Sequence, residues 1–353
     1  MQFLKFKHVL NQSNNSSTVQ VVVKSYFRFR GLEDETKIFK SLGGCYPAKW
    51  NPYCRPVGHY LDYLPSIGYH HRLNLDAQLP LMAPNTTLIT SIRSPLSFLH
   101  SSYNYFYRQF KSLEYGGAGC NVECSGEPFY GWLGNRTAVP VTEFLDVLDD
   151  VYKPGDKYSF RARNFQCYEM GLDEQADENE DAMRNEIIKV LNAFDSVIIT
   201  DRFLESLVLL AAVLHIPVEY LYAVSVNGRQ YEKPSLSAEQ MATFKKYFRM
   251  DIMLYELALE KMERQIESFG RERMKKELDK LHQMQAYCEN NKSVCKKNMK
   301  NHMKLAYDPR REQILAASNH IPHDARRNTV PLEREKGNVN GFNQFYRQLT
   351  LTF

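Results

Sequence analysis

The sequence lacks several features that would place it in a common class of proteins. Its longest apolar stretch runs from Leu207 to Val218, holds His215 and Pro217, and is too short for a helix that crosses a bilayer. Its 45 basic and 41 acidic residues leave a net charge of only +4, too small an excess to indicate nucleic-acid binding. We find no internal repeat and no low-complexity array. With 353 residues, 43% of them hydrophobic, the chain can bury one large α/β core, with or without a helical appendage.

Two chemical signatures are absent as well. The seven cysteines form no CxxC pairs with the spacing of a zinc site, so we expect no bound metal. The chain also has no G-x(4)-G-K-[ST] run, which disfavours a P-loop kinase.

The cysteines are arranged for local disulfides if the compartment is oxidising. Cys120 lies close in sequence to Cys124, and Cys288 lies close to Cys295, while the odd total leaves one thiol unpaired. Glycosylation sequons agree with a secretory protein, although such tripeptides also arise by chance. They begin at Asn11, Asn14, Asn15, Asn85, Asn135 and Asn291.

The most informative segment is TTLITSIRSPLSFLHSSYNYFY, residues 86–107. It predicts a short strand from Thr87, then a helix that starts at Pro95 with Ser94 as its cap. Ser101 lies off the apolar stripe of this helix, so it is free to bind a ligand. Arg93 stands at the carboxyl end of the strand, where open α/β sheets collect anions, and an Arg fork with a hydroxyl suits a phosphate. The alternative is a core helix beside a solvated arginine.

Other segments predict the rest of the fold. Residues 2–7 form a first strand, and residues 196–200 form a buried strand with Asp201 as a cap for the next helix. From Phe248 to Phe269, apolar residues recur at alternating steps of four and three, which predicts a long amphipathic helix. That helix packs on the sheet or, alternatively, forms a coiled-coil dimer seam. We expect one main domain over residues 1–300, with a long helical segment at 238–287, and a basic polar tail over 301–353.

Three stretches resemble one family. The pattern I-R-S-P-x-S-x(3)-S-x-Y-N-Y around Arg93 resembles the 3′-phosphate-binding segment of sulfotransferases that use 3′-phosphoadenosine 5′-phosphosulfate (PAPS), and more narrowly that of galactose-3-O-sulfotransferases. RNFQCYEMGLD from Arg163 and the long stretch from Phe194 to Arg229 resemble the same family. The resemblance implies an α/β, P-loop-like three-layer fold with a central parallel sheet and a long carboxy-terminal amphipathic helix. It also implies that Arg93 and Ser101 hold the 3′-phosphate of the nucleotide.

The loop expected to bind the 5′-phosphosulfate departs from the family pattern. The family reads approximately F-L-K-T-H-K-x-G-S-S-T, and here Ser16, Ser17 and Thr18 match its end. Without a gap, Ser13 takes the place of the motif lysine and Asn15 that of the glycine. With an insertion, Lys7 and His8 stand in for the His-Lys pair in swapped order, as catalytic candidates. We also expect Arg202 and Arg229 to help hold anions near the nucleotide.

The resemblance points to a histidine as the general base, a role that suits its pKa near 6.5. GYHHRLN matches a family stretch and indicates His71, with His8 as the competitor. Glu205 either orders the site or contacts acceptor sugar, or is a solvated acid in the first turn of its helix. Arg163 and Asn164 are assigned a structural or acceptor-side role.

The predicted function is transfer of a sulfuryl group from PAPS to the 3-hydroxyl of a terminal galactose on a glycolipid or glycoprotein, with no metal and no nucleic-acid partner. The alternative is a non-catalytic relative that binds nucleotide or glycan without turnover. Members of the family are Golgi membrane proteins with one amino-terminal anchor, so we expect a Golgi lumenal domain whose anchor is not present in this chain. The oligomeric state stays open.

Overall fold

The computed structural model describes residues 6–8, 49, 72–81, 87–104, 132, 136, 139–155, 159–173, 179–221 and 234–290. Within these residues, three parallel strands form one sheet in the order β1-β2-β3. The strands are β1 (Phe6–His8), β2 (Thr87–Ile92) and β3 (Ser196–Ile199). Parallel strands with helices between them are those of an α/β protein, as predicted. The loop that follows β1 lies outside the described residues, so the P-loop-like topology stays a prediction.

The central strand β2 is buried along its whole length. Its register brings Thr87 opposite Phe6 of β1 and Ile92 opposite Ile199 of β3. A strand that is buried on both faces needs hydrogen-bonding neighbours on both edges, which β1 and β3 supply. The predicted strands at residues 87 and 196 are confirmed.

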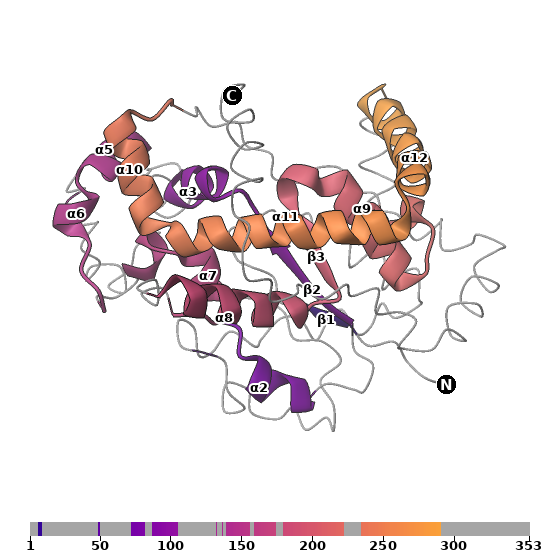
Figure 1. Ribbon diagram of the computed structural model, residues 1–353. Coiled ribbons are helices and arrows are strands. Elements are labelled where there is room, and N and C mark those ends of the chain that lie inside the picture. Colours follow the sequence, from indigo (N-terminus) through magenta and orange to yellow (C-terminus); the bar gives the residue numbers. More distant parts are fainter. Residues whose placement is uncertain are drawn as a thin grey trace, which may run out of the picture.

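Helices surround this sheet (Figure 1). In Figure 1, α11 crosses in front of the strands with α8 alongside it, and α12 turns away from its end. The helices described are α2 (Leu75–Gln78), α3 (Pro95–Tyr103), α5 (Val141–Asp146), α6 (Leu148–Val151), α7 (Phe165–Glu169), α8 (Glu180–Asn192), α9 (Phe203–Leu214), α10 (Ala238–Tyr247), α11 (Arg249–Phe269) and α12 (Arg271–Asn290). The short 3₁₀ helices are η3 (Leu79–Leu81), η6 (Ser159–Ala162), η7 (Thr200–Arg202) and η8 (Val218–Tyr220).

The buried apolar side chains form two clusters. The larger one joins the strands to α8, α9, α11 and α12, and includes Ile89, Ile198 and Leu254. The smaller one is rich in aromatic residues, joins α3, α5, α6, α10 and η6, and includes Phe98 and Phe144. Both α7 and α11 contribute to the two clusters. The chain passes from the larger cluster to the smaller one between β2 and α3.

The helical segment predicted over 238–287 is divided into α10, α11 and α12, with breaks at Phe248 and Gly270. α11 begins one residue after the predicted start at Phe248 and ends at Phe269, as predicted, and it contacts β3, α7, α8 and α9. Phe248, Met262 and Ile266, three residues of the predicted stripe, are buried in the two clusters. The stripe therefore packs inside this chain, and the coiled-coil alternative is wrong.

The buried face of α11 also carries polar residues that the apolar period does not mark. Asp251, Lys261 and Gln265 are buried together with Leu254 and Ala258, at steps of three and four. Lys261 donates through Nζ to the carbonyl oxygens of residues 191 and 194, 2.6 and 2.9 Å away, at the end of α8. Burial lowers the pKa of Lys261 to about 8.

No helix among the described residues is both long and apolar enough to cross a bilayer. The predicted tail over 301–353 lies outside the described residues, so the domain boundaries stay a prediction.

Candidate functional site

The carboxyl end of β2 leads directly to Arg93, and α3 begins at Pro95, as predicted. Ser94 occupies the N-cap position, but its side chain makes no capping hydrogen bond. The backbone N–H of Ser94 instead donates to Oδ2 of Asp201, 2.8 Å away. The prediction that Asp201 caps the helix after β3 is therefore wrong, because this carboxylate faces the neighbouring strand end.

Serines line one side of α3. Ser94, Ser97 and Ser101 are each half-buried and fall three and four residues apart, which places them on one helical face. Ser101 lies roughly 10 Å along the axis from Ser94, at 1.5 Å per residue. Arg93 at the start of this face is also half-buried. A guanidinium followed by hydroxyls at the carboxyl edge of a parallel sheet matches the chemistry of a phosphate site.

The backbone of Arg93 is held by one buried side chain, that of Gln166 in α7. Oε1 of Gln166 accepts from the Arg93 N–H at 2.9 Å, and Nε2 donates to the Arg93 carbonyl oxygen at 3.0 Å. This pair of bonds replaces those that a neighbouring strand would supply beyond Ile92. Arg93 is thus fixed by a residue distant in the sequence.

Gln166 is in turn fixed from α11. The carboxylate of Asp251 accepts from the N–H groups of Gln166 at 3.1 Å and Cys167 at 2.8 Å. Burial raises the pKa of Asp251 to about 6, and the two N–H donors lower it in part. Burial beside this carboxyl group also raises the pKa of the Cys167 thiol, which is a free cysteine. A carboxylate at the amino end of α7 also complements the dipole of that helix.

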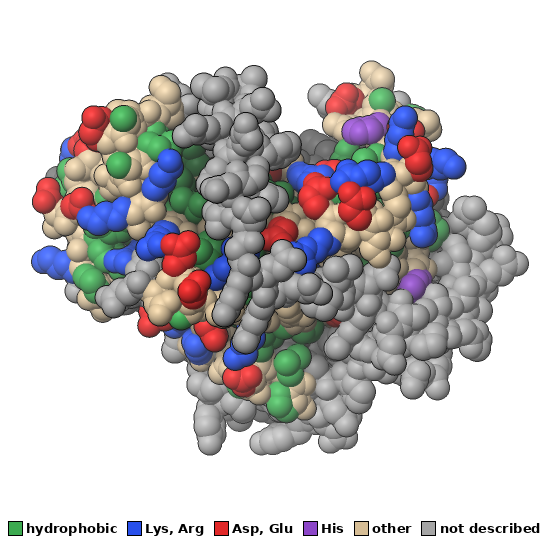
Figure 2. Space-filling view, viewed as in Figure 1, with side chains coloured by type: hydrophobic (Ala, Val, Ile, Leu, Met, Phe, Trp, Pro, Cys, Tyr) green, Lys and Arg blue, Asp and Glu red, His purple; other side chains and the backbone are tan. Residues whose placement is uncertain are grey.

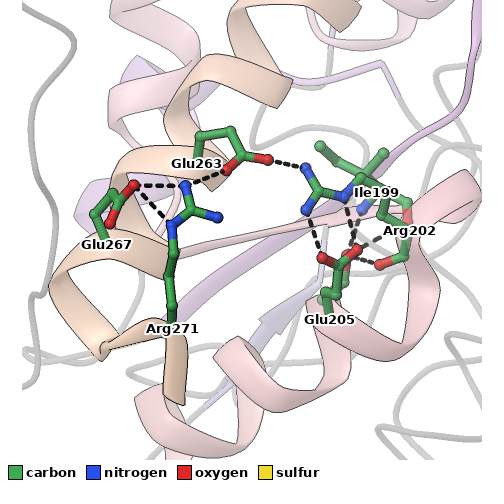
Figure 3. A network of polar contacts seen from close by, with 7 residues as sticks. Ile199, Arg202, Glu205, Glu263, Glu267 and Arg271 are labelled. Atoms are coloured by element: carbon green, nitrogen blue, oxygen red, sulfur yellow. Dashed lines mark hydrogen bonds and ion pairs between the residues drawn. The ribbon is translucent and has the colours of Figure 1, made fainter. Parts of the chain in front are cut away.

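A second network of polar side chains lies at the start of α9 (Figure 3). Arg202 donates through Nε to Glu205 at 2.6 Å and pairs through Nη1 with Glu263 of α11. Arg271 of α12 bonds to Glu263 at 3.4 Å and to Glu267, so the network spans three helices. These bonds raise the pKa of Arg202, with Glu205 as the largest cause. Two carboxylates thus already engage this guanidinium, and Glu205 serves an ion pair.

Basic and acidic side chains are also interspersed on the surface of α11 and α12. On the face drawn in Figure 2, acidic and basic side chains alternate along these helices rather than gather by sign. The pairs Arg264–Glu260 and Arg271–Glu267 account for part of this pattern.

The other predicted site residues are placed only in part. Lys7 and His8 lie in β1, and the backbone of His8 is paired with Ile89, four residues before Arg93. Ser16, Ser17, Thr18, His71 and Arg229 lie outside the described residues. The structure therefore places Arg93 directly after β2 and Ser101 in α3, and the ligand-binding assignments stay predictions.

Arg163 and Asn164 have structural roles, one of the two predicted alternatives. The Arg163 guanidinium lies 5.7 Å from the ring centre of Tyr152 and 5.9 Å from that of Tyr247. Asn164 accepts backbone bonds from the start of α11. Tyr103 is a core residue, and its hydroxyl donates to the carbonyl of Val139 at 2.9 Å.

The sequence analysis missed Gln166 and Asp251. The available signal was the helical spacing of Asp251 from Leu254 and Ala258, which places a carboxylate on an apolar face where it needs donors nearby. No cluster of His, Cys, Asp or Glu in the described part of the chain is arranged to hold a metal ion. Cys288 is disulfide-bonded to a partner outside the described residues.

Comparison with known proteins identifies the family to which the sequence is similar. The sequence model for galactose-3-O-sulfotransferase matches residues 129–315, which include α7, β3 and α11 but not β2 and α3. No solved structure matches the chain.

Three similar proteins agree with this match. Galactosylceramide sulfotransferase of Mus musculus is 28% identical over 228 residues, 63% of this chain and 49% of that protein. Its counterpart in Bos taurus is 29% identical over 226 residues, 62% and 49% of the two chains. Galactose-3-O-sulfotransferase 3 of Mus musculus is 26% identical over 188 residues, 52% and 38% of the two chains. The chain spans about half the length of the first two relatives and a smaller share of the third. The family match covers more than half of this chain. The chain belongs to the galactose-3-O-sulfotransferase family.

Proposed function

We propose that this protein transfers a sulfuryl group from PAPS to the 3-hydroxyl of a terminal galactose on a glycolipid or glycoprotein. The observation that carries the proposal is Arg93, fixed at the carboxyl end of β2 in a chain of this family. The P-loop-like three-layer topology is part of the same proposal.

The described residues fit the 3′-phosphate of the nucleotide. Arg93 supplies a planar cation with paired donors, and Ser101 supplies a hydroxyl on the half-buried face of α3. The 5′-phosphosulfate is assigned to Ser16, Ser17 and Thr18, with Arg229 as a further anion contact. PAPS supplies the activated sulfuryl group when bound.

The chemistry required of the protein is positioning and electrostatic stabilisation, as in phosphoryl transfer. His71 or His8 accepts the proton of the acceptor hydroxyl during in-line attack. Lys7 is assigned the developing negative charge of the leaving phosphate. Lys7 and His8 lie in β1, the strand next to β2, and Arg93 follows the last residue of β2.

A non-catalytic relative that binds nucleotide or glycan is the second candidate. It is favoured by Ser13 and Asn15, which stand where the family pattern has lysine and glycine. Loss of the lysine removes a charge-assisted contact worth roughly a hundredfold in rate.

The proposed location is the Golgi membrane, with the residues described here on its lumenal side. The disulfide at Cys288 supports this location, since disulfides persist in oxidising compartments.

The test is calorimetric titration of the purified chain with 3′-phosphoadenosine 5′-phosphate (PAP), with a parallel transfer assay using PAPS and a galactose-terminated acceptor. Arg93→Ala is expected to weaken binding roughly a hundredfold, as bidentate charge-assisted bonds are lost. Arg249→Ala is the control, because Arg249 is a surface arginine that pairs with Glu180 and should leave binding unchanged. Binding with transfer supports the enzyme, binding without transfer supports the non-catalytic relative, and no binding contradicts both nucleotide proposals.

A further inference from the structure

Three successive backbone groups at the end of β2 are held by side chains from other elements. The N–H and carbonyl of Arg93 bond to Gln166, and the N–H of Ser94 bonds to Asp201. Strand ends that lead into a loop ordinarily have more freedom than this. The orientation of the Arg93 main chain is thus determined by α7 on one side and by the end of β3 on the other.

Gln166 is well placed to act as a rigid support. Its side chain is fully buried, both polar atoms of its amide are bonded to Arg93, and its own N–H is bonded to Asp251. Asp251 is also fully buried. A buried polar group whose bonding is complete has one favoured orientation, since any other leaves donors or acceptors unpaired.

This support lies where the two apolar clusters meet. Along α7, Phe165 belongs to the aromatic cluster and Cys167 to the larger one, with Gln166 between them. At the start of α11, Phe248, which caps the helix, belongs to the aromatic cluster, whereas Met250 belongs to the larger one, next to Asp251. Apolar packing alone specifies position poorly at such a boundary, whereas hydrogen bonds specify one register.

We propose that Gln166, held by Asp251, is a positioning residue for nucleotide binding, which acts by setting the direction in which Arg93 presents its guanidinium. This inference rests on the proposed function, since it takes the 3′-phosphate as the ligand of Arg93. A bidentate guanidinium contact depends on angle as well as distance, so a small rotation of the Arg93 backbone weakens it. In this proposal Gln166 acts through Arg93, to which both polar atoms of its amide are bonded.

The main variant is Gln166→Met, which keeps the length of the side chain and removes both bonds to Arg93. We expect the affinity for PAP, measured by calorimetry, to fall roughly tenfold, the effect of about 1.4 kcal/mol. The matched control is Asp195→Ala. Asp195 bonds to the N–H of Leu88 at 2.7 Å, at the opposite end of β2, so its loss should lower stability without changing PAP affinity.

A double-mutant cycle that combines Gln166→Met with Arg93→Ala separates positioning of the guanidinium from a general loss of structure. Each protein is titrated with PAP at low ionic strength. Once the guanidinium is gone, Gln166→Met should change PAP affinity less than about twofold. Equal effects of Gln166→Met in both backgrounds, or no effect in the wild type, overturn the inference. If Arg93→Ala itself binds PAP normally, the proposed phosphate site has failed and the inference falls with it.

Gln166→Glu keeps the inference testable if the methionine variant does not fold. A neutral carboxyl group has one acceptor and one donor, as the amide has, whereas a carboxylate cannot donate to the Arg93 carbonyl. PAP affinity of this variant should therefore approach that of the wild type as the pH is lowered. The wild type at each pH is the reference, because Asp251 titrates in the same range. A pH-independent ratio between the two proteins contradicts the inference.

Discussion

Asn164 and Asp251 cap each other's helices. Oδ1 of Asn164 accepts from the N–H groups of Met250 at 2.9 Å and Asp251 at 3.4 Å, at the start of α11. The carboxylate of Asp251 accepts from the N–H groups of Gln166 and Cys167, at the start of α7. Each helix thus supplies an acceptor for first-turn N–H groups of the other, and these bonds tie α7 to α11.

Replacement of Asn164 tests this reciprocal capping. Asn164 has a left-handed backbone, with φ of 44°, so alanine loses the cap and also adds backbone strain, whereas glycine loses only the cap. We expect Asn164→Gly to lower the free energy of unfolding by about 1 kcal/mol and Asn164→Ala by roughly 2 to 3 kcal/mol. Urea unfolding of both variants measures the difference. Equal losses would show that the backbone conformation carries no strain.

Asp251 gives stability a defined pH dependence. Its pKa is raised to about 6 in the folded state from 3.8, so between these values the folded protein binds a proton that the unfolded chain does not. Stability from this group therefore falls as the pH rises from about 4 to about 6, by roughly 3 kcal/mol at 1.4 kcal/mol per pKa unit. Asp251→Asn lacks this dependence. Urea unfolding of the two proteins across pH 4–7 checks it, and parallel curves would contradict it.

Gly171 is a position where a side chain does not fit. Its φ is +83°, and a Cβ atom there would lie 2.3 Å from the carbonyl oxygen of Leu73. Gly155 has a similar φ of +82° with nothing within 4 Å of its Cβ position. Alanine at Gly155 therefore measures the cost of the backbone conformation without a steric clash. We expect Gly155→Ala to cost about 1 kcal/mol of unfolding free energy and Gly171→Ala at least about twice that. Similar thermal denaturation of the two variants would refute the steric argument.

Arg202 is expected to act in stability rather than in ligand binding. Its ion pairs with Glu205 and Glu263 are partly exposed, so Arg202→Ala should cost about 1 kcal/mol of stability at low salt and less at high salt. PAP affinity should stay that of the wild type. A large loss of affinity in Arg202→Ala, with normal stability, would instead place this guanidinium at the nucleotide.

The local sequence pattern was sufficient to predict the elements around β2. The strand at Thr87 and the helix from Pro95 follow from short-range rules, because β-branched residues favour strands and proline suits the first turn of a helix. The same holds for α11, whose apolar residues recur with the helical period. Motifs of the family were also readable, because they are contiguous in the sequence.

By itself, then, the sequence determined the parallel α/β class, the family and the position of Arg93 at a strand end. Only the tertiary structure decided which residues hold Arg93. Gln166 lies 73 residues from Arg93, and Asp251 lies 85 residues from Gln166. No local rule connects residues so far apart, because their bonds form only when α7 and α11 pack at the boundary of the two clusters. The direction of Asp201, toward Ser94 rather than along its own helix, was decided in the same way. The donor that it meets is the N–H of Ser94, between β2 and α3, which comes close only because β2 and β3 are paired.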